Sequence, residues 1–298
     1  MNEGIVLVKH RKGYKAIEKR FNPDMIRSGW AANEVRALSR CNNTYICQYF
    51  GADLEYQKYG YGSLFMERCE LGSLETVIKN FSRYDQVIPE GFLWEVLYDI
   101  SLAIAYIQSG DDAEPLARQG KSLTPDMKRV GWTVMVHSDI KPANMFLTMR
   151  DAKTHLPTVV LGDFGCCINV SSNKRNGRKP LLKACTRAFA PPEAPYYSQG
   201  SDLYSMALSV HCAAMKRQIP SKDRSKARDY PLGRSDDLPY SNALEGMMRR
   251  MLKDESDCRP DPLVLPYLIR RECKAAKTEL RLRGIEGADR PLPEWAFD

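Results

Sequence analysis

The middle of the sequence holds side chains that could transfer a phosphoryl group. Within His137–Asn144, Asp139 can accept a proton from a hydroxyl group, and Lys141 can place a positive charge near a phosphate. Asn144 and Asp163, the latter in an Asp-Phe-Gly segment, offer oxygen atoms that suit the hard cation Mg²⁺. Phosphoryl transfer needs an in-line hydroxyl, metal ions that neutralise charge, and donors on the moving group. The spacing therefore predicts this chemistry.

A third motif, Ala190-Pro191-Pro192-Glu193, follows the first two in the chain. Each motif alone is weak evidence, because a lone Asp-Phe-Gly usually marks a turn and a lone His-x-Asp is often structural. In this order and spacing, however, the three motifs resemble the catalytic loop, the metal-binding DFG segment and the APE-like end of the activation segment of eukaryotic protein kinases.

The resemblance to protein kinases covers most of the chain and implies an α+β, two-lobed fold with ATP and Mg²⁺ as cofactors. It implies a small, strand-rich N-lobe at residues 1–69, without its first strand, and a larger helical C-lobe at residues 70–298. The C-lobe would carry an insertion at about residues 109–130. By this resemblance, the site residues would be the catalytic groups Asp139, Lys141, Asn144, Asp163, Lys19, Glu34 and Thr186.

Two further segments of the C-lobe match the same pattern. Asp202, in Ser201–Ser205, resembles the aspartate that supports the backbone of the catalytic loop, and Arg259 resembles the late arginine that pairs with the APE glutamate, here Glu193. Thr186 would contact Asp139 and Lys141, with its hydroxyl group bonded to Asp139. These matches predict that residues far apart in the sequence hold the catalytic loop and the activation segment in place.

The nucleotide-binding residues follow from the resemblance as well. Lys19, at the end of Ala16–Lys19, resembles the lysine that binds the α- and β-phosphates, and Glu34 would be its ion-pair partner. Without the other motifs, both would be more simply explained as surface residues. Around the adenine, the resemblance implies Gly4, Val6, Ile17, the gatekeeper Met66, the hinge backbone of Glu67 to Cys69, and Phe146, with Asp163 toward the phosphates.

The type of kinase is indicated by the residues near the catalytic aspartate. Lys141, two positions after Asp139, is typical of serine/threonine kinases rather than tyrosine kinases. The segments Lys141–Leu147 and Leu161–Gly165 are most similar to those of the NIMA-related kinases. The expected substrates are therefore serine or threonine residues of proteins.

Four positions depart from the kinase pattern. The sequence contains no GxGxxG motif, and Gly4 would be only the last glycine of that loop. Ser138 replaces the arginine that commonly binds a phosphate on the activation segment. Ile17 stands where a small alanine usually faces adenine, unless a one-residue bulge intervenes, and Cys185 replaces a glycine. We therefore expect activity that does not depend on phosphorylation of Ser171 or Ser172.

Two alternatives to an active protein kinase remain open. The missing glycine-rich loop and Ser138 would suit a pseudokinase that acts as a binding scaffold, although Lys19, Asp139, Asn144 and Asp163 are all present. A kinase-like enzyme that phosphorylates small molecules would share the catalytic loop, but it would lack the APE-like segment.

The composition sets further limits. The 298 residues carry a formal charge of +7, and the clusters at Lys174–Lys179 and Arg270–Arg283 lack the interleaved aromatic residues that single-strand binders use. We therefore expect no nucleic-acid partner. The nine cysteines show no CxxC pair, which disfavours zinc and fits a reducing compartment. The absence of a long apolar run predicts no membrane span and an intracellular location, cytoplasmic and/or nuclear.

The elements that must position these residues can be read from periodicity. We expect a hairpin of Gly4–Val8 and Tyr14–Phe21, one helix at Asp24–Arg40, and strands at Tyr45–Phe50 and Leu64–Cys69. From Gly72 onward the pattern is mostly helical, with Ser73 as a cap. The expected helices are Leu74–Phe81, a long one that opens at Pro89 and runs to Ile107, Asp202–Met215, Asn242–Lys253 and Leu263–Lys277, and short strands are expected at Val134–Val136, Met145–Thr148 and Val159–Leu161.

Overall fold

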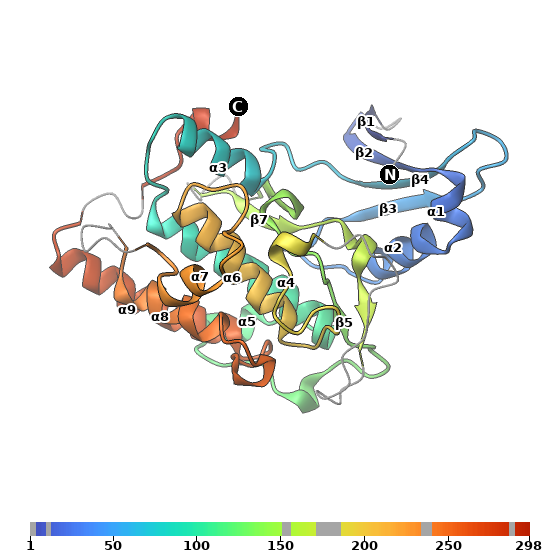
Figure 1. Ribbon diagram of the computed structural model, residues 1–298. Helices are drawn as coiled ribbons and strands as arrows, with labels where there is room; N and C mark the ends of the chain where they lie inside the picture. The colour runs from blue at the N-terminus through green and yellow to red at the C-terminus, as the bar shows by residue number, and fades with distance from the viewer. Residues whose placement is uncertain (1–3, 10–12, 151–155, 171–185, 234–239, 286–289) are drawn as a thin grey trace.

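The computed structural model describes residues 4–9, 13–150, 156–170, 186–233, 240–285 and 290–298. It has a small part built on an antiparallel sheet and a larger, mostly helical part (Figure 1). The sheet ends with strand β4 at Glu67, and the first helix of the large part, α3, begins at Leu74. This is the two-lobed architecture expected from the sequence.

The N-lobe sheet has the strand order β1-β2-β4-β3, all antiparallel. The strands are β1 (Gly4–Lys9), β2 (Lys15–Phe21), β3 (Tyr49–Asp53) and β4 (Gly62–Glu67). Strand β1 lies at the edge of the sheet, and the described residues supply no strand outside it. The small antiparallel sheet is the one expected of the N-lobe.

The helical part of the N-lobe differs from the single helix predicted at Asp24–Arg40. The chain forms a short helix α1 (Pro23–Arg27), capped by the side chain of Asn22, and then α2 (Trp30–Ser39). Gly29 separates them with a φ of 80°, a left-handed conformation that glycine adopts without steric cost. The break lets α2 take its own direction and bury Glu34 beneath the sheet.

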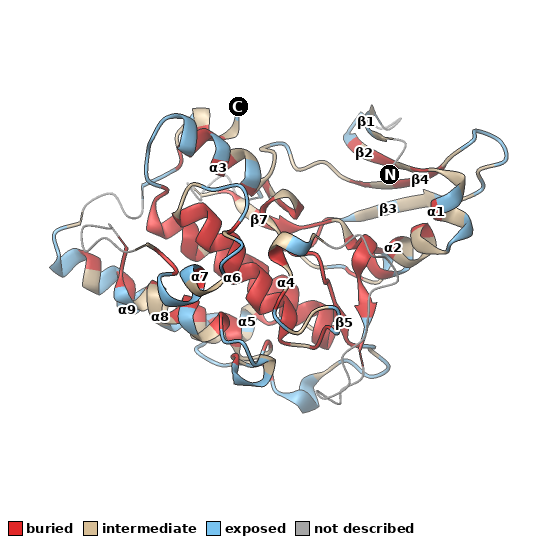
Figure 2. Cartoon of the chain, in the orientation of Figure 1, coloured by how far each residue is buried: buried red, intermediate tan, exposed pale blue. Residues whose placement is uncertain are grey.

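Helices α4 (Glu90–Ser109) and α6 (Ser201–Ala214) form the centre of the C-lobe. Both are buried along almost their whole length, as Figure 2 shows in red. Helices apolar on all sides are typical of the core of a large domain. Around them lie α3 (Leu74–Arg83), which Ser73 caps as predicted, α8 (Asn242–Met251) and α9 (Leu265–Leu282).

Two pairs of short strands carry the catalytic segments. Strands β5 (Met135–Val136) and β8 (Ile168–Asn169) pair with each other, as do β6 (Met145–Thr148) and β7 (Thr158–Leu161). The loop His137–Asn144 lies between β5 and β6, and Asp163 lies between β7 and β8. The loop His137–Asn144 and Asp163 are therefore each flanked by one strand of either pair.

The predicted insertion contains structure that the sequence did not indicate. It holds a helix α5 (Glu114–Arg118) and a 3₁₀ helix η1 (Pro125–Met127), and α5 packs against α9. The indole nitrogen of Trp132 donates a hydrogen bond to the carbonyl of Ile107, 3.0 Å away. The insertion is therefore packed against α9 and is followed by a residue bonded to the C-terminal part of α4. The remaining elements are α7 (Ser225–Asp229), the 3₁₀ helices η2 (Pro142–Asn144), η3 (Phe164–Cys166), η4 (Arg187–Phe189) and η5 (Ser256–Cys258), and a terminal one, η6 (Glu294–Phe297).

The C-terminal segment packs beside α3, where the rings of Trp295 and Phe81 have centroids 4.8 Å apart. Asn80 donates hydrogen bonds to the backbone carbonyls of Ala296 and Asp298, each at 3.2 Å. Across the part of the chain that the structure describes, no helix has the length and apolar character to span a bilayer.

Candidate active site

The catalytic loop is held by a buried carboxylate. Asp202, in the first turn of α6, accepts hydrogen bonds from the backbone N–H groups of His137 at 2.7 Å and Ser138 at 2.9 Å. Ser138 has a φ of 66°, a left-handed conformation that is costly for a residue other than glycine. The two bonds stabilise this backbone shape. Burial raises the pKa of Asp202. The hydrogen bonds from the two N–H groups act in the opposite direction, because they stabilise the charged form.

His137 links the loop to the Asp-Phe-Gly segment. Its Nδ1 atom accepts a bond from the backbone N–H of Asp139 at 3.4 Å, so Nε2 is the donor to the carbonyl of Gly162, 3.0 Å away. The imidazole ring packs edge-on against the fully buried ring of Phe164, with centroids 4.9 Å apart. The loop and the Asp-Phe-Gly segment are thereby fixed relative to each other.

Asp139 is the centre of a compact hydrogen-bond network. The Lys141 ammonium group lies 2.8 Å from Asp139 Oδ2 and 2.8 Å from the Thr186 hydroxyl oxygen. Asn144 donates its side-chain N–H group to the Asp139 carbonyl at 2.9 Å. The four predicted residues of the catalytic loop and the activation segment are thus brought together.

Thr186 contacts both of its predicted partners, Asp139 and Lys141, but the group that reaches Asp139 is not the expected hydroxyl. Its hydroxyl oxygen accepts from Lys141, whereas the contact to Asp139 Oδ1, at 2.7 Å, comes from the backbone N–H of Thr186. The side chain and the backbone of one residue point to different partners, and the sequence does not show which takes which. Any residue except proline could supply the backbone bond.

Lys19 joins the two lobes through a buried ion-pair network. Its Nζ atom lies 2.6 Å from Glu34 Oε1 and 2.7 Å from Asp163 Oδ1. Burial lowers the pKa of Lys19, but the two carboxylates outweigh that effect and the pKa is raised. Burial raises the pKa of Glu34 to about 7, against the opposing attraction of Lys19. The second oxygen of Glu34, Oε2, is buried without a hydrogen-bond partner among the described residues.

Asp163 lies between the ion-pair network and open space. It keeps 38% of its side chain exposed, and its φ of 60° is again left-handed. Burial alone would raise its pKa, but attraction to Lys19 lowers it below the ordinary value. Asp163 is therefore ionised and partly accessible, as a ligand for a metal ion must be.

Two contacts between α2 and the Asp-Phe-Gly segment were not foreseen from the sequence. The indole nitrogen of Trp30 donates to the carbonyl of Gly165 at 2.6 Å, and the side-chain amide of Asn33 donates to the carbonyl of Cys167 at 2.9 Å. A Cβ atom at position 165 would lie 2.8 Å from the Trp30 ring, so the close approach requires glycine. Helix α2, which carries Glu34, is thus tied directly to the segment that carries Asp163.

The predicted nucleotide residues line a cavity of about 380 Å³ between the lobes. Small-molecule sites typically measure about 300–1,000 Å³. Predicted residues that line it are Ile17, Lys19, Glu34, Met66, Glu67, Cys69, Asn144, Phe146 and Asp163. They are joined by residues not singled out from the sequence, including Ile5, Cys47, Gly72, Ser73, Thr76 and Ala143.

Gly4 and Val6 are not among the residues that line the cavity, and Ile5 is. The reason is the pairing of β1 with β2, in which Ile5 lies opposite Lys19 and Val6 lies opposite Glu18. Successive strand residues point to opposite faces of a sheet. Ile5 therefore shares the face of Lys19, and the place at the cavity that was expected of Val6 is taken by Ile5.

Ile17 faces the cavity without any local distortion of the strand. The pairing of β2 with β4 runs without a bulge, and Ile17 lies opposite Met66. The bulge considered as an alternative is absent from these paired strands. A branched side chain and the gatekeeper thus stand side by side at the cavity, with Phe146 also contributing to its lining.

The activation segment ends at a buried ion pair. Arg259 and Glu193 form two parallel bonds, Nη1 to Oε1 at 2.7 Å and Nη2 to Oε2 at 2.8 Å. The Arg259 side chain is fully buried, and Glu193 keeps 21% exposure. Ser201, at the start of α6, donates its hydroxyl to Glu193 Oε1 at 2.7 Å. The predicted partners therefore meet.

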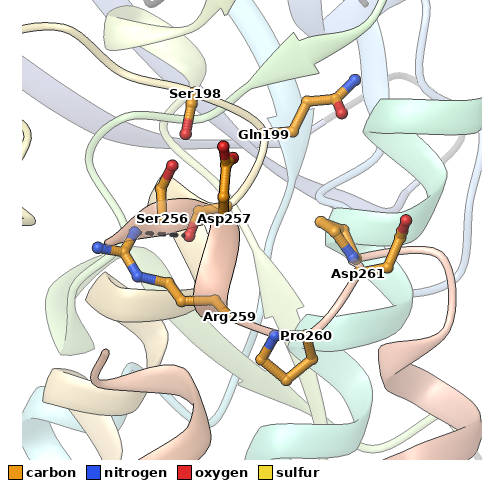
Figure 3. A pocket seen from close by; sticks show the side chains of 9 residues that line it. Ser198, Gln199, Ser256, Asp257, Arg259, Pro260 and Asp261 are labelled. Atoms are coloured by element: carbon orange, nitrogen blue, oxygen red, sulfur yellow. Dashed lines mark hydrogen bonds between the residues drawn. The ribbon is translucent and has the colours of Figure 1, made fainter. Parts of the chain in front are cut away.

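The remaining donors of Arg259 are also satisfied. They bond to the carbonyls of Gly200 at 3.0 Å, Lys253 at 2.8 Å and Asp254 at 3.0 Å. Figure 3 shows this arginine beside Ser256 and a small pocket that it lines. Five bonds to one guanidinium group make this a fixed structural joint.

Several positions discussed from the sequence lie outside the described residues. They are Ser171, Ser172, the basic run Lys174–Lys179, and Cys185. The expectation that activity does not depend on phosphate at Ser171 or Ser172 stays a prediction.

Comparison with known proteins agrees with this geometry. The G2-specific protein kinase nimA of Emericella nidulans is 28% identical over 219 residues, which cover 68% of this chain and 29% of that protein. The G2-specific protein kinase nim-1 of Neurospora crassa is 27% identical over 242 residues, which cover 75% of this chain and 27% of that protein. This chain is related to the NIMA-type protein kinases. No protein-family model matches it.

The relationship to NIMA-type kinases and the two-lobed arrangement together identify the fold as that of a protein kinase. The chain spans less than a third of the length of either relative.

Proposed function

We propose that this chain is a protein serine/threonine kinase that transfers the γ-phosphate of ATP with the help of Mg²⁺. The observation that carries the proposal is the meeting of two networks at one cavity. Lys19, Glu34 and Asp163 form the first network and line the cavity. The second network is centred on Asp139 and Lys141, and it reaches the cavity through Asn144, which bonds to Asp139. Buried charged groups that converge on one cavity are typical of functional sites.

Binding of ATP would use the lining of the cavity. The backbone of Glu67 to Cys69 would bind the adenine edge, and Ile5, Ile17 and Phe146 would contact its faces. Lys19 would bind the phosphates, with Glu34 holding its ammonium group in place. A bound phosphate would then share Lys19 with Asp163.

The residues present fit Mg²⁺ by their chemistry. Asn144 donates its N–H group to Asp139, which leaves its amide oxygen as an acceptor, and Asp163 is an ionised carboxylate. No group of three or more His, Cys, Asp or Glu side chains forms a metal site among the described residues. Mg²⁺ commonly binds one or two protein oxygens together with substrate phosphates. The ion would neutralise phosphate charge in this arrangement.

The phosphoacceptor side would use the second network. Asp139 would accept the proton of a serine or threonine hydroxyl and orient its oxygen toward the phosphorus. Lys141 holds Asp139 Oδ2 at 2.8 Å and would supply positive charge to the transferring group. Since little covalent chemistry is needed, positioning and charge would provide most of the rate enhancement.

A second candidate function is that of a nucleotide-binding or empty scaffold without transfer activity. The observation in its favour is the lack of a GxGxxG motif in the sequence, whose backbone amides usually cover the phosphates. Ser138 in place of the usual arginine points the same way. The intact networks around Asp139 and Asp163 weigh against it.

One experiment separates these functions. The wild-type chain and Asp139→Asn would be tested for Mg²⁺·ATP binding by calorimetry and for transfer of labelled γ-phosphate to a serine/threonine peptide library. We expect Asp139→Asn to bind nucleotide but to lose transfer by at least about 10²-fold. Asp126→Asn, an exposed change in the insertion, is the matched control.

The outcomes differ for each candidate. Binding without transfer by the wild type would support the scaffold, and absence of both would contradict the kinase proposal. Equal transfer by wild type and Asp139→Asn would show that Asp139 is not the catalytic base.

A further inference from the structure

The segment that follows Thr186 carries an exposed arginine beside the proposed catalytic base. Thr186 is bonded to Asp139 and Lys141 through its backbone and its hydroxyl. The next residue, Arg187, begins the 3₁₀ helix η4 and is exposed to solvent. A peptide whose hydroxyl reaches Asp139 must therefore pass close to Arg187.

A second arginine braces this segment from the C-lobe. Arg224, just before α7, donates from its Nη2 atom to the carbonyls of Ala188 and, at 3.4 Å, Arg187. Its Nη1 atom is buried and has no hydrogen-bond partner among the described residues. Arg224 thus holds the backbone of η4 and brings a second positive charge to it.

The basic side chains of this region outnumber the carboxylates close to them. Within the residues that the structure describes, Arg187, Arg217, Lys222, Arg224 and Lys226 form no ion pair. Of the nearby carboxylates, Asp254 pairs with Arg228, and Asp223 accepts from Ser225 while the charges of Lys226 and Arg228 contribute to its lowered pKa. Lys216 pairs with Asp85. The region therefore carries more positive than negative charge.

The buried His211 on α6 places two of these charges close together. Burial is the main reason for its lowered pKa, and the charges of Arg217 and Arg224 lower it further. Of the two, Arg224 is the one that also contacts the backbone of η4. The positive field at Arg187 has more than one source.

We propose that Arg187, supported by Arg224, binds an acidic side chain of the substrate next to the phosphoacceptor residue. This inference rests on the proposed kinase function and names the substrate class of the same site. An exposed guanidinium group can form two parallel bonds with a carboxylate or a phosphate, which gives both attraction and orientation. The occupant is a peptide with an anionic residue adjacent to its serine or threonine.

Peptide kinetics test the inference. A neutral serine peptide would be compared with variants that carry Glu or Gln at each position flanking the serine. We expect at least one position where Glu raises kcat/KM over Gln by about five-fold, the range of a well-placed exposed ion pair. The ratio should fall as ionic strength rises. A phosphoserine at the same position distinguishes phosphate from carboxylate as the preferred anion.

Two protein variants locate the effect. Arg187→Gln should reduce the Glu/Gln ratio to about one, because an uncharged amide has no ion pair to form with the carboxylate. Arg281→Gln removes the same charge from an exposed position on α9 and should keep the ratio of the wild type. Melting temperatures of both variants check that they fold.

The failure of this inference is distinguishable from the failure of the proposed function. If no peptide is phosphorylated, the kinase proposal is wrong. If peptides are phosphorylated but Glu and Gln give equal kcat/KM at every position, the acidic preference is wrong. If the Glu/Gln ratio of kcat/KM persisted in Arg187→Gln, the preference would come from other residues. If the ratio in the wild type did not change with ionic strength, an ion pair would be excluded even if Arg187→Gln did not fold.

Discussion

Two buried ion pairs in this molecule are built from similar groups and differ in how completely they are satisfied. Arg259 places five bonds on Glu193 and three backbone carbonyls. Lys19 bonds to two carboxylates, and Glu34 Oε2 has no partner among the described residues. Arg259 and Glu193 lie in the C-lobe and do not line the cavity, whereas Lys19 and Glu34 do.

The difference follows from what each pair must do. A fully bonded arginine fork has one stable arrangement, which suits a joint between the activation segment and α6. A lysine with compact charge can exchange one partner for another, which suits a group that must receive phosphate. Incomplete satisfaction costs stability, and active sites are where such a cost is commonly kept.

The largest expected effect concerns the satisfied pair. Glu193→Ala should lower the free energy of unfolding by about 3 kcal/mol, the low end for breaking a buried pair, because Arg259 keeps its carbonyl partners. Chemical denaturation would measure it. Glu245→Ala removes a carboxylate from the exposed pair with Arg249 and should cost less than about 1 kcal/mol. Equal losses in the two variants would contradict the contrast between the pairs.

Removal of Lys19 from the incompletely bonded pair should lower activity more than stability. Lys19→Met should lower kcat/KM for peptide phosphorylation by about 10²-fold, since a cation aimed at the transferring phosphates is lost. Its melting temperature should change little, because Met fills a similar volume and Glu34, whose pKa is already raised to about 7, can bind a proton once its cation is gone. A variant with normal turnover and a lowered melting temperature would reverse the roles given to the two pairs.

Glu34 adds a pH dependence. Because its folded-state pKa of about 7 lies above the ordinary value of 4.5, the carboxyl contributes stability below about pH 4.5 and loses it as pH rises through 7. The raised pKa of Lys19 acts at higher pH, and the lowered pKa of Asp163 acts at lower pH. Between pH 5 and 8, wild type should therefore lose stability relative to Glu34→Gln, by about 2–3 kcal/mol.

Denaturation at several pH values measures this difference. If the free energies of unfolding of wild type and Glu34→Gln changed with pH in parallel, Glu34 would be ionised across the whole range. The attraction of Lys19 would then outweigh the effect of burial on the pKa of Glu34.

The smallest expected effect distinguishes the two contacts of Thr186. Thr186→Ala keeps the backbone bond to Asp139 and loses only the hydroxyl that accepts from Lys141. We expect kcat to fall by about ten-fold, one hydrogen bond to a charged group, and Thr186→Ser to restore it. Complete loss of activity in Thr186→Ala, with no rescue by serine, would mean that the backbone contact had also changed.

The resemblance to protein kinases, carried by motifs in a fixed order and spacing, predicted the groups that meet in the site. One network joins Asp139, Lys141, Asn144 and Thr186. Their residue types are those that phosphoryl transfer would use. The fork between Glu193 and Arg259 was predicted from residues far apart in the sequence. Such pairings can be inferred because each partner belongs to a motif with its own local signature.

Details that depend on strand phase or on backbone direction could not be inferred in this way. Ile5 rather than Val6 faces the cavity, because the face of an edge strand is set by its register with β2. The two partners of Thr186 depend on the local path of the chain. The break at Gly29 was missed because the apolar pattern continues across it. Trp30 gave no signal, since an indole at the start of a helix more often packs in the core.

The bond between Trp30 and Gly165 has a consequence for ligand design. Compounds that require Phe164 to leave its buried pocket would have to break the indole bond to Gly165, the Asn33 bond to Cys167 and the edge contact with His137. All three would have to be broken before such a compound gained a contact. Inhibitors that bind while Phe164 stays in its buried pocket do not have to break these contacts, so a screening collection would be better drawn from such compounds. Cys69, which lines the cavity, offers a thiol for selective covalent attachment.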